Sequence, residues 1–145
     1  MVIKIFYVVM RKEVVDIVKK ILLDLQSRIN ARNMERTLLQ EMDCWQVVIS
    51  PHPDQTAEFC RMHHPQILLM EVTGYTPWTL SERMNLRERL HQSNPDCKLV
   101  LMVDERADQA LADEVTLIKR DGLIDAYILG SVDSPYYLTS TLNSL

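Results

Sequence analysis

Two short runs of almost uninterrupted apolar residues constrain the fold of this chain more than any other feature. Residues 66–72 (QILLMEV) follow Pro65 and end just before Gly74, and residues 98–103 (KLVLMV) repeat the pattern about one βα unit later. A run that is apolar at consecutive positions suits a strand that is buried on both faces, as in a parallel sheet covered by helices. The two runs therefore predict central strands of an α/β fold.

The rest of the chain alternates between strand-like and helix-like patterns. Three further strands are predicted at residues 3–9, 45–49 and 125–129. Four helices with apolar residues at helical spacing are predicted at 12–29, 55–63, 79–92 and 107–119, and a last helix opens at Ser134-Pro135. Residues 34–41 form a short helix or extend the first one, so the arrangement of residues 26–44 stays open. Asp54 is placed to cap the helix that begins at residue 55.

Strands that alternate with crossover helices predict a parallel sheet with helices on both faces. The chain has 145 residues, of which 47% are hydrophobic and 25% charged. This length and composition suit one globular domain, which we expect to cover residues 1–145.

The charge of the chain argues against direct binding of nucleic acid. Its formal net charge is −4, and its basic residues form no long run. The densest cluster is Arg83, Arg87 and Arg89, and because glutamates are interleaved with it we expect a solvated helix face.

The three cysteines form no CxxC motif, so we expect reduced thiols and neither a disulfide framework nor a metal site. The apolar stretch at the N-terminus is too short to span a membrane and has no small-residue cleavage site. These features predict a cytoplasmic protein without a membrane segment.

Three segments resemble the receiver domains of response regulators. HHPQILLMEVTGYTP is similar to the third strand and following loop of a receiver, KLVLMVDERAD to the fourth strand, and DAYILGSVDSPYYLTSTL to the fifth strand and last helix. The resemblance runs from about residue 45 to the C-terminus. It implies a flavodoxin-like (CheY-like), doubly wound, five-stranded parallel sheet in three α/β/α layers.

The resemblance also implies where a phosphorylation site would lie. Receivers use two acids after the first strand for Mg²⁺, an aspartate after the third as acceptor, a hydroxyl after the fourth and a lysine after the fifth. In this sequence the corresponding positions are Met10 and Arg11 (followed by Lys12), Glu71, Val103 or Asp104, and Gly130. Tyr127 alone matches a functional position, that of the aromatic side chain that changes rotamer in switching receivers.

This set of residues predicts a pseudo-receiver. Transfer of a phosphoryl group to a carboxylate brings anions together, and a metal and a lysine must neutralise them. Neither the Mg²⁺ ligands nor the lysine is present at these positions, so we expect no phosphorylation, no metal and no cofactor. Arg11 could pair with Glu71 and replace the metal by a fixed cation; alternatively, Glu71 is a solvated carboxylate in a degenerate pocket.

We therefore expect a signalling domain that acts through protein–protein contacts and is not an enzyme. In the family, the face formed by the fourth helix, fifth strand and fifth helix forms dimers or docks an output domain. Here that face draws on residues 107–119, 125–129 and 135–142, with Tyr136 and Tyr137 as candidate interface residues.

Two alternatives remain. One is a protein, or an enzyme, that binds a small anion or other small ligand on a flavodoxin-like fold, although the segment MRKEV after the predicted first strand lacks the Ser/Thr/Gly-rich loop that a flavin phosphate needs. The other is a working phosphorelay receiver that uses Glu71 as the acceptor. The adjacent pair His63-His64 diverges on a helix and is a poor metal site.

Overall fold

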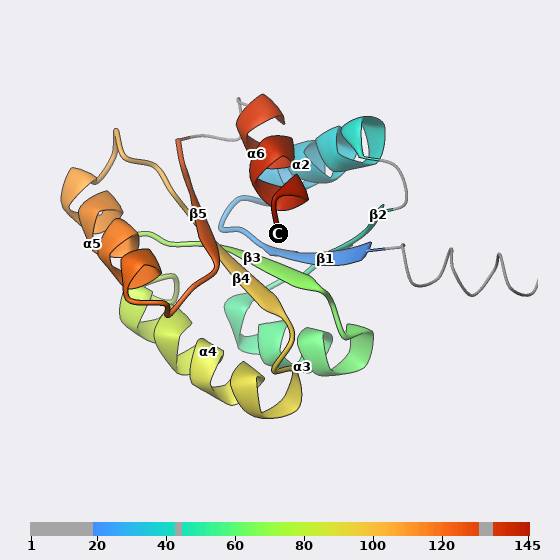
Figure 1. Cartoon of the computed structure of the whole chain (residues 1–145), viewed down its shortest axis with the longest axis horizontal. Helices are drawn as coiled ribbons and strands as arrows, with labels where there is room; N and C mark the ends of the chain where they lie inside the picture. The colour runs from blue at the N-terminus through green and yellow to red at the C-terminus, as the bar shows by residue number, and fades with distance from the viewer. Residues whose placement is uncertain (1–18, 43–44, 131–134) are drawn as a thin grey trace, which may run out of the picture.

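A single five-stranded parallel sheet organises the structure. The computed structural model describes residues 19–42, 45–130 and 135–145, with the backbone alone at 135–137. The strands are β1 (Lys19–Asp24), β2 (Trp45–Ile49), β3 (Ile67–Glu71), β4 (Lys98–Val103) and β5 (Ala126–Leu129). The helices are α2 (Arg28–Glu41), α3 (Pro53–His63), α4 (Leu80–Ser93), α5 (Gln109–Arg120) and α6 (Pro135–Asn143). The strand order is β2-β1-β3-β4-β5 (Figure 1).

Helices cover both faces of the sheet, as the alternation of elements predicts. In Figure 1, α2 and α6 lie on one side of the strands, and α3, α4 and α5 lie on the other. Side chains alternate between two apolar clusters: Ile21 and Leu23 face α2 and α6, whereas Leu22 and Leu68 face the other three helices. The result is the doubly wound, three-layer α/β/α arrangement predicted from the sequence.

Most predicted elements are confirmed. The strands at 45–49 and 98–103 have the predicted bounds, and the other elements after residue 45 agree with prediction to within two residues. The cap of α3 is a correction. His52 is the capping residue rather than Asp54, since its ring accepts the Asp54 N–H at 3.2 Å, with Pro53 at the first helical position.

The predicted helix over 12–29 is wrong in its second half. Residues 19–24 form β1, which pairs in parallel with both β2 and β3. The predicted strand at 3–9 lies outside the described residues. The error has a physical cause: Ile21, Leu22 and Leu23 are all fully buried, and a short run of this kind fits helical spacing as well as it fits a central strand.

Residues 28–41 form one helix, so the segment 34–41, which the sequence left open, is the second half of α2. Ser27 caps α2 by accepting the Asn30 N–H at 3.2 Å. Ala31, Met34 and Leu38 are buried at helical spacing, so the polar residues between them lie on the outer side. In the part of the chain that the structure describes, no helix is long and apolar enough to cross a membrane.

Candidate functional site

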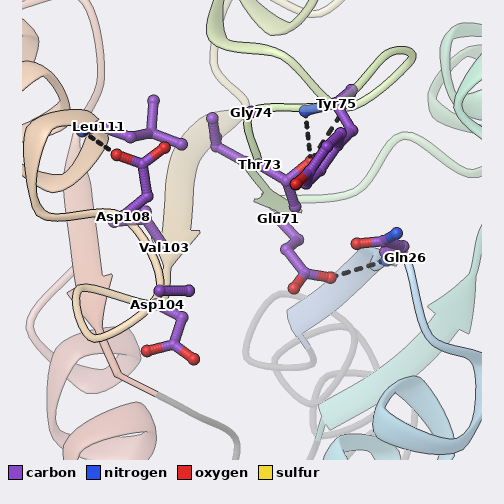
Figure 2. A pocket seen from close by; sticks show the side chains of 11 residues that line it. Gln26, Glu71, Thr73, Gly74, Tyr75, Val103, Asp104, Asp108 and Leu111 are labelled. Carbon is purple, nitrogen blue, oxygen red and sulfur yellow. Dashed lines mark hydrogen bonds between the residues drawn. The ribbon is translucent and has the colours of Figure 1, made fainter.

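A pocket lies where the carboxyl ends of β1, β3 and β4 meet, the edge at which sheets of this topology bind ligands. Its volume is about 550 Å³. Figure 2 shows residues that follow β3 on one side of it and residues that follow β4 on the other. It is lined by Gln26, Glu71, Val72, Thr73, Gly74, Tyr75, Val103, Asp104, Ala107, Asp108 and Leu111. The structure thus brings together three predicted site residues, Glu71, Val103 and Asp104.

Glu71 ends β3 and holds a fixed position. Its Oε1 accepts the backbone N–H of Gln26 at 2.8 Å, as the dashed line in Figure 2 shows. Gln26 follows β1, so this hydrogen bond joins the ends of two neighbouring strands. Glu71 is therefore only partly solvated, and part of its hydrogen-bonding capacity serves the loop after β1.

Three carboxylates face or border the pocket. Besides Glu71 they are Asp104, which accepts the Arg106 N–H at 3.0 Å, and Asp108, which caps α5 by accepting the Leu111 N–H at 3.0 Å. Among the described residues none of the three has an ion-pair partner. The pocket combines these three acidic side chains with apolar lining residues that include Val103.

Other predicted residues lie elsewhere. Gly130 follows β5 with φ 114° and donates its N–H to the Val103 carbonyl at 3.0 Å, but it does not line the pocket. Tyr127 is half-buried in β5 against the apolar cluster beneath α3, α4 and α5. Tyr136 and Tyr137 lie in α6, and their side chains are outside the described part of the structure.

Met10, Arg11 and Lys12 also lie outside the described residues, so pairing of Arg11 with Glu71 stays a prediction. Their predicted place at the end of the first strand of the sheet needs correction. β1 ends at Asp24 and is followed by Leu25. These two residues occupy the position that the resemblance gives to the acidic pair, and only the first is an acid.

Asp24 forms a buried ion pair with Arg83 of α4. Both side chains are 1% exposed. Arg83 Nη1 donates to Asp24 Oδ2 at 2.6 Å and Nη2 to Oδ1 at 3.2 Å, in a bidentate arrangement. The same guanidinium donates to the main-chain carbonyls of Asp24 and Glu71, at 3.2 and 2.9 Å. The prediction that Arg83 lies on a solvated helix face is therefore wrong.

Two hydroxyl groups extend this pair into a buried network. Thr56 Oγ1 donates to Asp24 Oδ2 at 2.5 Å, and Ser50 Oγ lies 2.7 Å from Thr56 Oγ1. Asp24 Oδ2 thus receives both a guanidinium and a hydroxyl donor. Burial of a carboxylate is tolerated when it is paired and hydrogen-bonded in this way.

Asp24 is a site residue that the hydrophobic pattern of the sequence does not reveal. The signal was present, because an acid directly follows the apolar run ILL in KKILLD. An acid that ends a buried strand marks the carboxyl edge of the sheet, but the run ILL also fits the helical spacing of residues 12–29, which predicts a helix there.

No family model and no curated protein matches the sequence. Solved structures do match. A receiver domain protein (CheY-like) from Methanospirillum hungatei JF-1 superposes with a TM-score of 0.67 at 17% identity, over 88% of this chain and 92% of that one. The REC domain of AraT, a response regulator from Geobacillus stearothermophilus, gives 0.63 at 13% identity, over 86% and 92%.

An orphan response regulator of H. pylori, HP1043, gives a TM-score of 0.64 at 10% identity, over 87% of this chain and 94% of that one. Similarity at this level of identity shows the fold. The chain has the CheY-like, flavodoxin-like fold of response-regulator receiver domains, as its sequence predicts.

Proposed function

We propose that this chain, which has the receiver fold, is a signalling domain that works without phosphorylation and acts through contacts with a partner protein or output domain. The observation that carries the proposal is the Asp24–Arg83 pair. A guanidinium already neutralises the one acid at the end of β1. The permanent positive charge of Arg83 takes the place of the positive charge that a bound metal ion supplies in phosphorylatable receivers.

The surroundings of Asp24 make Mg²⁺ binding unfavourable. Mg²⁺ demands octahedral oxygen ligands, usually with one or two carboxylates. Leu25 offers no oxygen in its side chain, and both carboxylate oxygens of Asp24 already accept bonds from Arg83. A metal ion would have to displace a buried guanidinium and leave it without a partner, which is costly.

The acceptor position is equally poor for phosphoryl transfer. Glu71 is one methylene longer than an aspartate, and its Oε1 is engaged by the Gln26 N–H. None of the described residues that line the pocket is a lysine or an arginine. A phosphoryl group here would meet the carboxylates of Asp104 and Asp108 without a compensating cation.

The experiment that tests this proposal is intact-mass spectrometry after incubation with acetyl phosphate and Mg²⁺. We expect no added phosphoryl group, whereas a phosphorylatable receiver in the same tube gains one and shows that the reagent is active. A Mg²⁺ titration followed by tryptophan fluorescence should be flat. A phosphoryl adduct that disappears in Glu71→Ala would overturn the proposal in favour of a working phosphorelay receiver.

Signalling through contacts needs an exposed surface, and the face formed by α5, β5 and α6 is the first candidate. Leu117 of α5 and Leu123, just after α5, are exposed large apolar residues at 46% and 38%. A homodimer through this face would be disrupted by Leu117→Glu. Sedimentation velocity of the parent and of Leu117→Glu measures whether each forms a dimer. A variant that dimerises as the parent does would exclude this face as the interface.

A small-ligand-binding protein is the second candidate, because a volume of about 550 Å³ lies within the range of ligand pockets. The three carboxylates of the pocket disfavour the binding of a small anion, which is one of the ligands that the sequence suggests. A thermal-shift screen of small molecules, repeated with Glu71→Gln, distinguishes this candidate: a ligand whose stabilising effect is lost in the variant would favour it over a pure interaction domain.

A further inference from the structure

The sheet ends at β2 on one side, and the outer edge of this strand has no strand neighbour among the residues that the structure describes. Its inner edge pairs with β1, and this ladder continues to Ser50, which donates its N–H to the Leu23 carbonyl at 2.8 Å. Because the main-chain groups of successive residues point to opposite sides of a strand, those of Gln46 and Val48 face β1 as well. The residues whose main-chain groups point outward, which we call the open edge, are Trp45, Val47 and Ile49.

The open edge lacks the features that usually protect an edge strand. Trp45–Ile49 (WQVVI) contains no charged residue and no proline, and its pairing with β1 is regular. The side chains of the open edge pack on the apolar cluster beneath α2 and α6 but are only partly buried, whereas Ile21 and Leu23 of the neighbouring β1 are fully buried. The edge therefore offers both main-chain groups and apolar surface to a further strand.

A segment suited to this edge precedes β1 in the chain. The sequence predicts a strand over residues 3–9, which lie outside the described residues. The segment reads IKIFYVV: it is rich in β-branched and aromatic residues, contains no glycine or proline and carries one charge, on Lys4. An uncovered segment of this composition is prone to pair with other chains. On the outside of a sheet, Lys4 would protect the new edge.

We propose that residues 3–9 pair in antiparallel orientation with the open edge of β2 in the same chain and add a strand to the sheet. Only residues 10–18 separate this segment from Lys19, which begins β1 beside Trp45 of β2. The outer side of β2 lies two strand spacings, or about 10 Å, from β1. A connection of this length spans about 13 Å as a helix and about 30 Å when extended, so either conformation reaches the open edge.

The length of the connection also selects the direction and the edge. An antiparallel strand ends at the amino end of β2, where β1 begins, so the connection only has to cross β2. A parallel strand would end at the carboxyl end, and a return along the sheet takes a dozen or more residues. Among the described strands β5 forms the other edge, but its outer side lies four strand spacings, roughly 19 Å, from β1. A connection over residues 10–18 therefore favours β2.

The alternation of side chains selects the register. The odd-numbered residues of the segment are all aliphatic or aromatic, whereas the even-numbered ones include Lys4. The odd-numbered side match the side chains of the open edge, because α2 and α6 cover that face of the sheet. Tyr7 then lies opposite Val47, and Ile5 lies opposite Ile49. A slip by one residue would place Lys4 on the apolar cluster, which is unfavourable.

This arrangement has a consequence for the pocket. Arg11 and Lys12 follow the added strand at the amino end of the sheet, whereas Glu71 lies at the carboxyl end. Arg11 is then about one strand length away from Glu71 and does not pair with it. The inference is independent of the proposed function, which rests on Asp24 and Arg83.

The first test is a disulfide between the paired positions in the full chain. Directly opposed residues of a hydrogen-bonded antiparallel pair have Cα atoms about 5.5 Å apart, which suits a disulfide. The variant Tyr7→Cys, Val47→Cys is oxidised with glutathione disulfide, which takes up the two electrons, and the link is located by peptide mass mapping. We expect an intramolecular link between positions 7 and 47. The matched control, Phe6→Cys with Val47→Cys, directs one thiol to the opposite face and should link at least about tenfold more slowly.

The other results of this experiment would overturn the inference. A link between two molecules would place the segment on a second copy of the chain. A faster link in the variant Tyr7→Cys, Tyr127→Cys would place it on β5. No link, or equal rates in the test pair and the Phe6→Cys control, would show that the segment does not occupy the open edge in this register. Circular dichroism establishes that each variant retains the fold.

Amide hydrogen exchange in the unmodified chain, followed by NMR, is the second test. Val48 donates toward β1 and should exchange slowly in every case, whereas Val47 and Ile49 should exchange slowly only when a strand covers the open edge. Tyr7→Pro removes the N–H that faces Val47 and should speed exchange at Val47 at least about tenfold, with Val48 unchanged. Val8→Pro is the control, because its N–H faces away from β2. Fast exchange at Val47 in the parent, or protection that survives Tyr7→Pro, would overturn the inference.

Discussion

Arg83 Nη1 lies 2.6 Å from Asp24 Oδ2 with both side chains buried, so that a residue of α4 is tied to the end of β1. The two residues are 59 positions apart in the chain. The pair also links β3, because Arg83 Nε donates to the Glu71 carbonyl. The carboxyl edge of the sheet is thus fixed by one guanidinium, and its stability should depend strongly on that group.

Arg83→Met should destabilise the protein by about 3–5 kcal/mol, because it leaves the Asp24 carboxylate buried without a cation. Urea denaturation measures this as a lower midpoint. The double variant Arg83→Met, Asp24→Leu should recover much of the loss, since no uncompensated charge remains. Arg89→Met, at an exposed position of the same helix, is the control and should change the free energy of unfolding by less than about 0.5 kcal/mol. Equal effects of the two arginine variants would contradict the buried pair.

Thr56→Val should cost about 1–2 kcal/mol, because it removes the hydroxyl donor to Asp24 with little change of side-chain volume. The Ser50 hydroxyl loses Thr56 as a partner as well, but its one hydrogen is then free to bond the His52 carbonyl, which lies 3.0 Å away. Ser50→Ala should cost less than Thr56→Val, because it leaves the Thr56 hydroxyl bonded to the Asp24 carboxylate. Denaturation midpoints of the two variants compare these costs, and the reverse order would show that Thr56 does not donate to the carboxylate.

The order of the elements could be predicted from the sequence because each buried strand after residue 45 is a compact apolar run between turn residues. The runs that end at Glu71 and Val103 also locate the carboxyl edge of the sheet, so the sequence predicts that Glu71, Val103 and Asp104 lie at the site. β1 is not evident in the sequence because Lys19 and Lys20 precede a run of only three fully buried aliphatic residues. Periodicity does not separate such a run from one side of a helix.

The buried pair could not be predicted in the same way. Arg83 and Arg87 are four residues apart among glutamates, a pattern typical of a solvated helix face. Arg83 is nevertheless buried, because α4 packs so that this side chain reaches the end of β1. Which of two similar arginines is buried depends on tertiary packing and on an acid far away in the chain, and neither is local information.

Two thiols, the buried Cys60 and the half-buried Cys97, give a pH dependence. Burial, aided by the nearby Cys97 and Asp24, raises the pKa of Cys60 from 9.0 to about 12, and burial beside Asp125 raises that of Cys97 likewise. Below about pH 9 both thiols are protonated in the folded and unfolded states. Between about pH 9 and 12 they ionise only in the unfolded chain, so stability should fall as pH rises.

Urea denaturation at a series of pH values above neutrality checks this prediction. Cys97→Ala should flatten the decline, because it removes one of the two groups while Cys60 and all lysines and tyrosines remain. Identical slopes in the parent and the variant would mean that Cys97 titrates normally in the folded state.

Gly130→Ala should destabilise the protein by about 1–2 kcal/mol, because φ 114° is a conformation that residues with a Cβ rarely adopt. Apart from its chain neighbours, no atom of the residues that the structure describes lies within 4 Å of the added carbon, so the expected cost is one of backbone strain. Gly74→Ala is the matched control. Its Cβ would lie 3.5 Å from Asp108 Oδ2, an ordinary contact, and its φ is not positive. The midpoint of thermal unfolding should be lower for Gly130→Ala than for Gly74→Ala. Equal midpoints would contradict backbone strain at position 130.

Glu71→Asp gives the side chain the length of the aspartate acceptor of receiver domains, yet it should not lead to phosphorylation. The shorter side chain gives up the hydrogen bond from the Gln26 N–H and frees its oxygens toward the pocket. Arg83 still holds Asp24, Leu25 still supplies no ligand for Mg²⁺, and Gly130 still supplies no cation. Intact mass after treatment with acetyl phosphate and Mg²⁺ should be unchanged in this variant as in the parent. A phosphoryl adduct on the substituted position would show that acceptor length alone prevents the reaction, and that the buried guanidinium does not replace the metal.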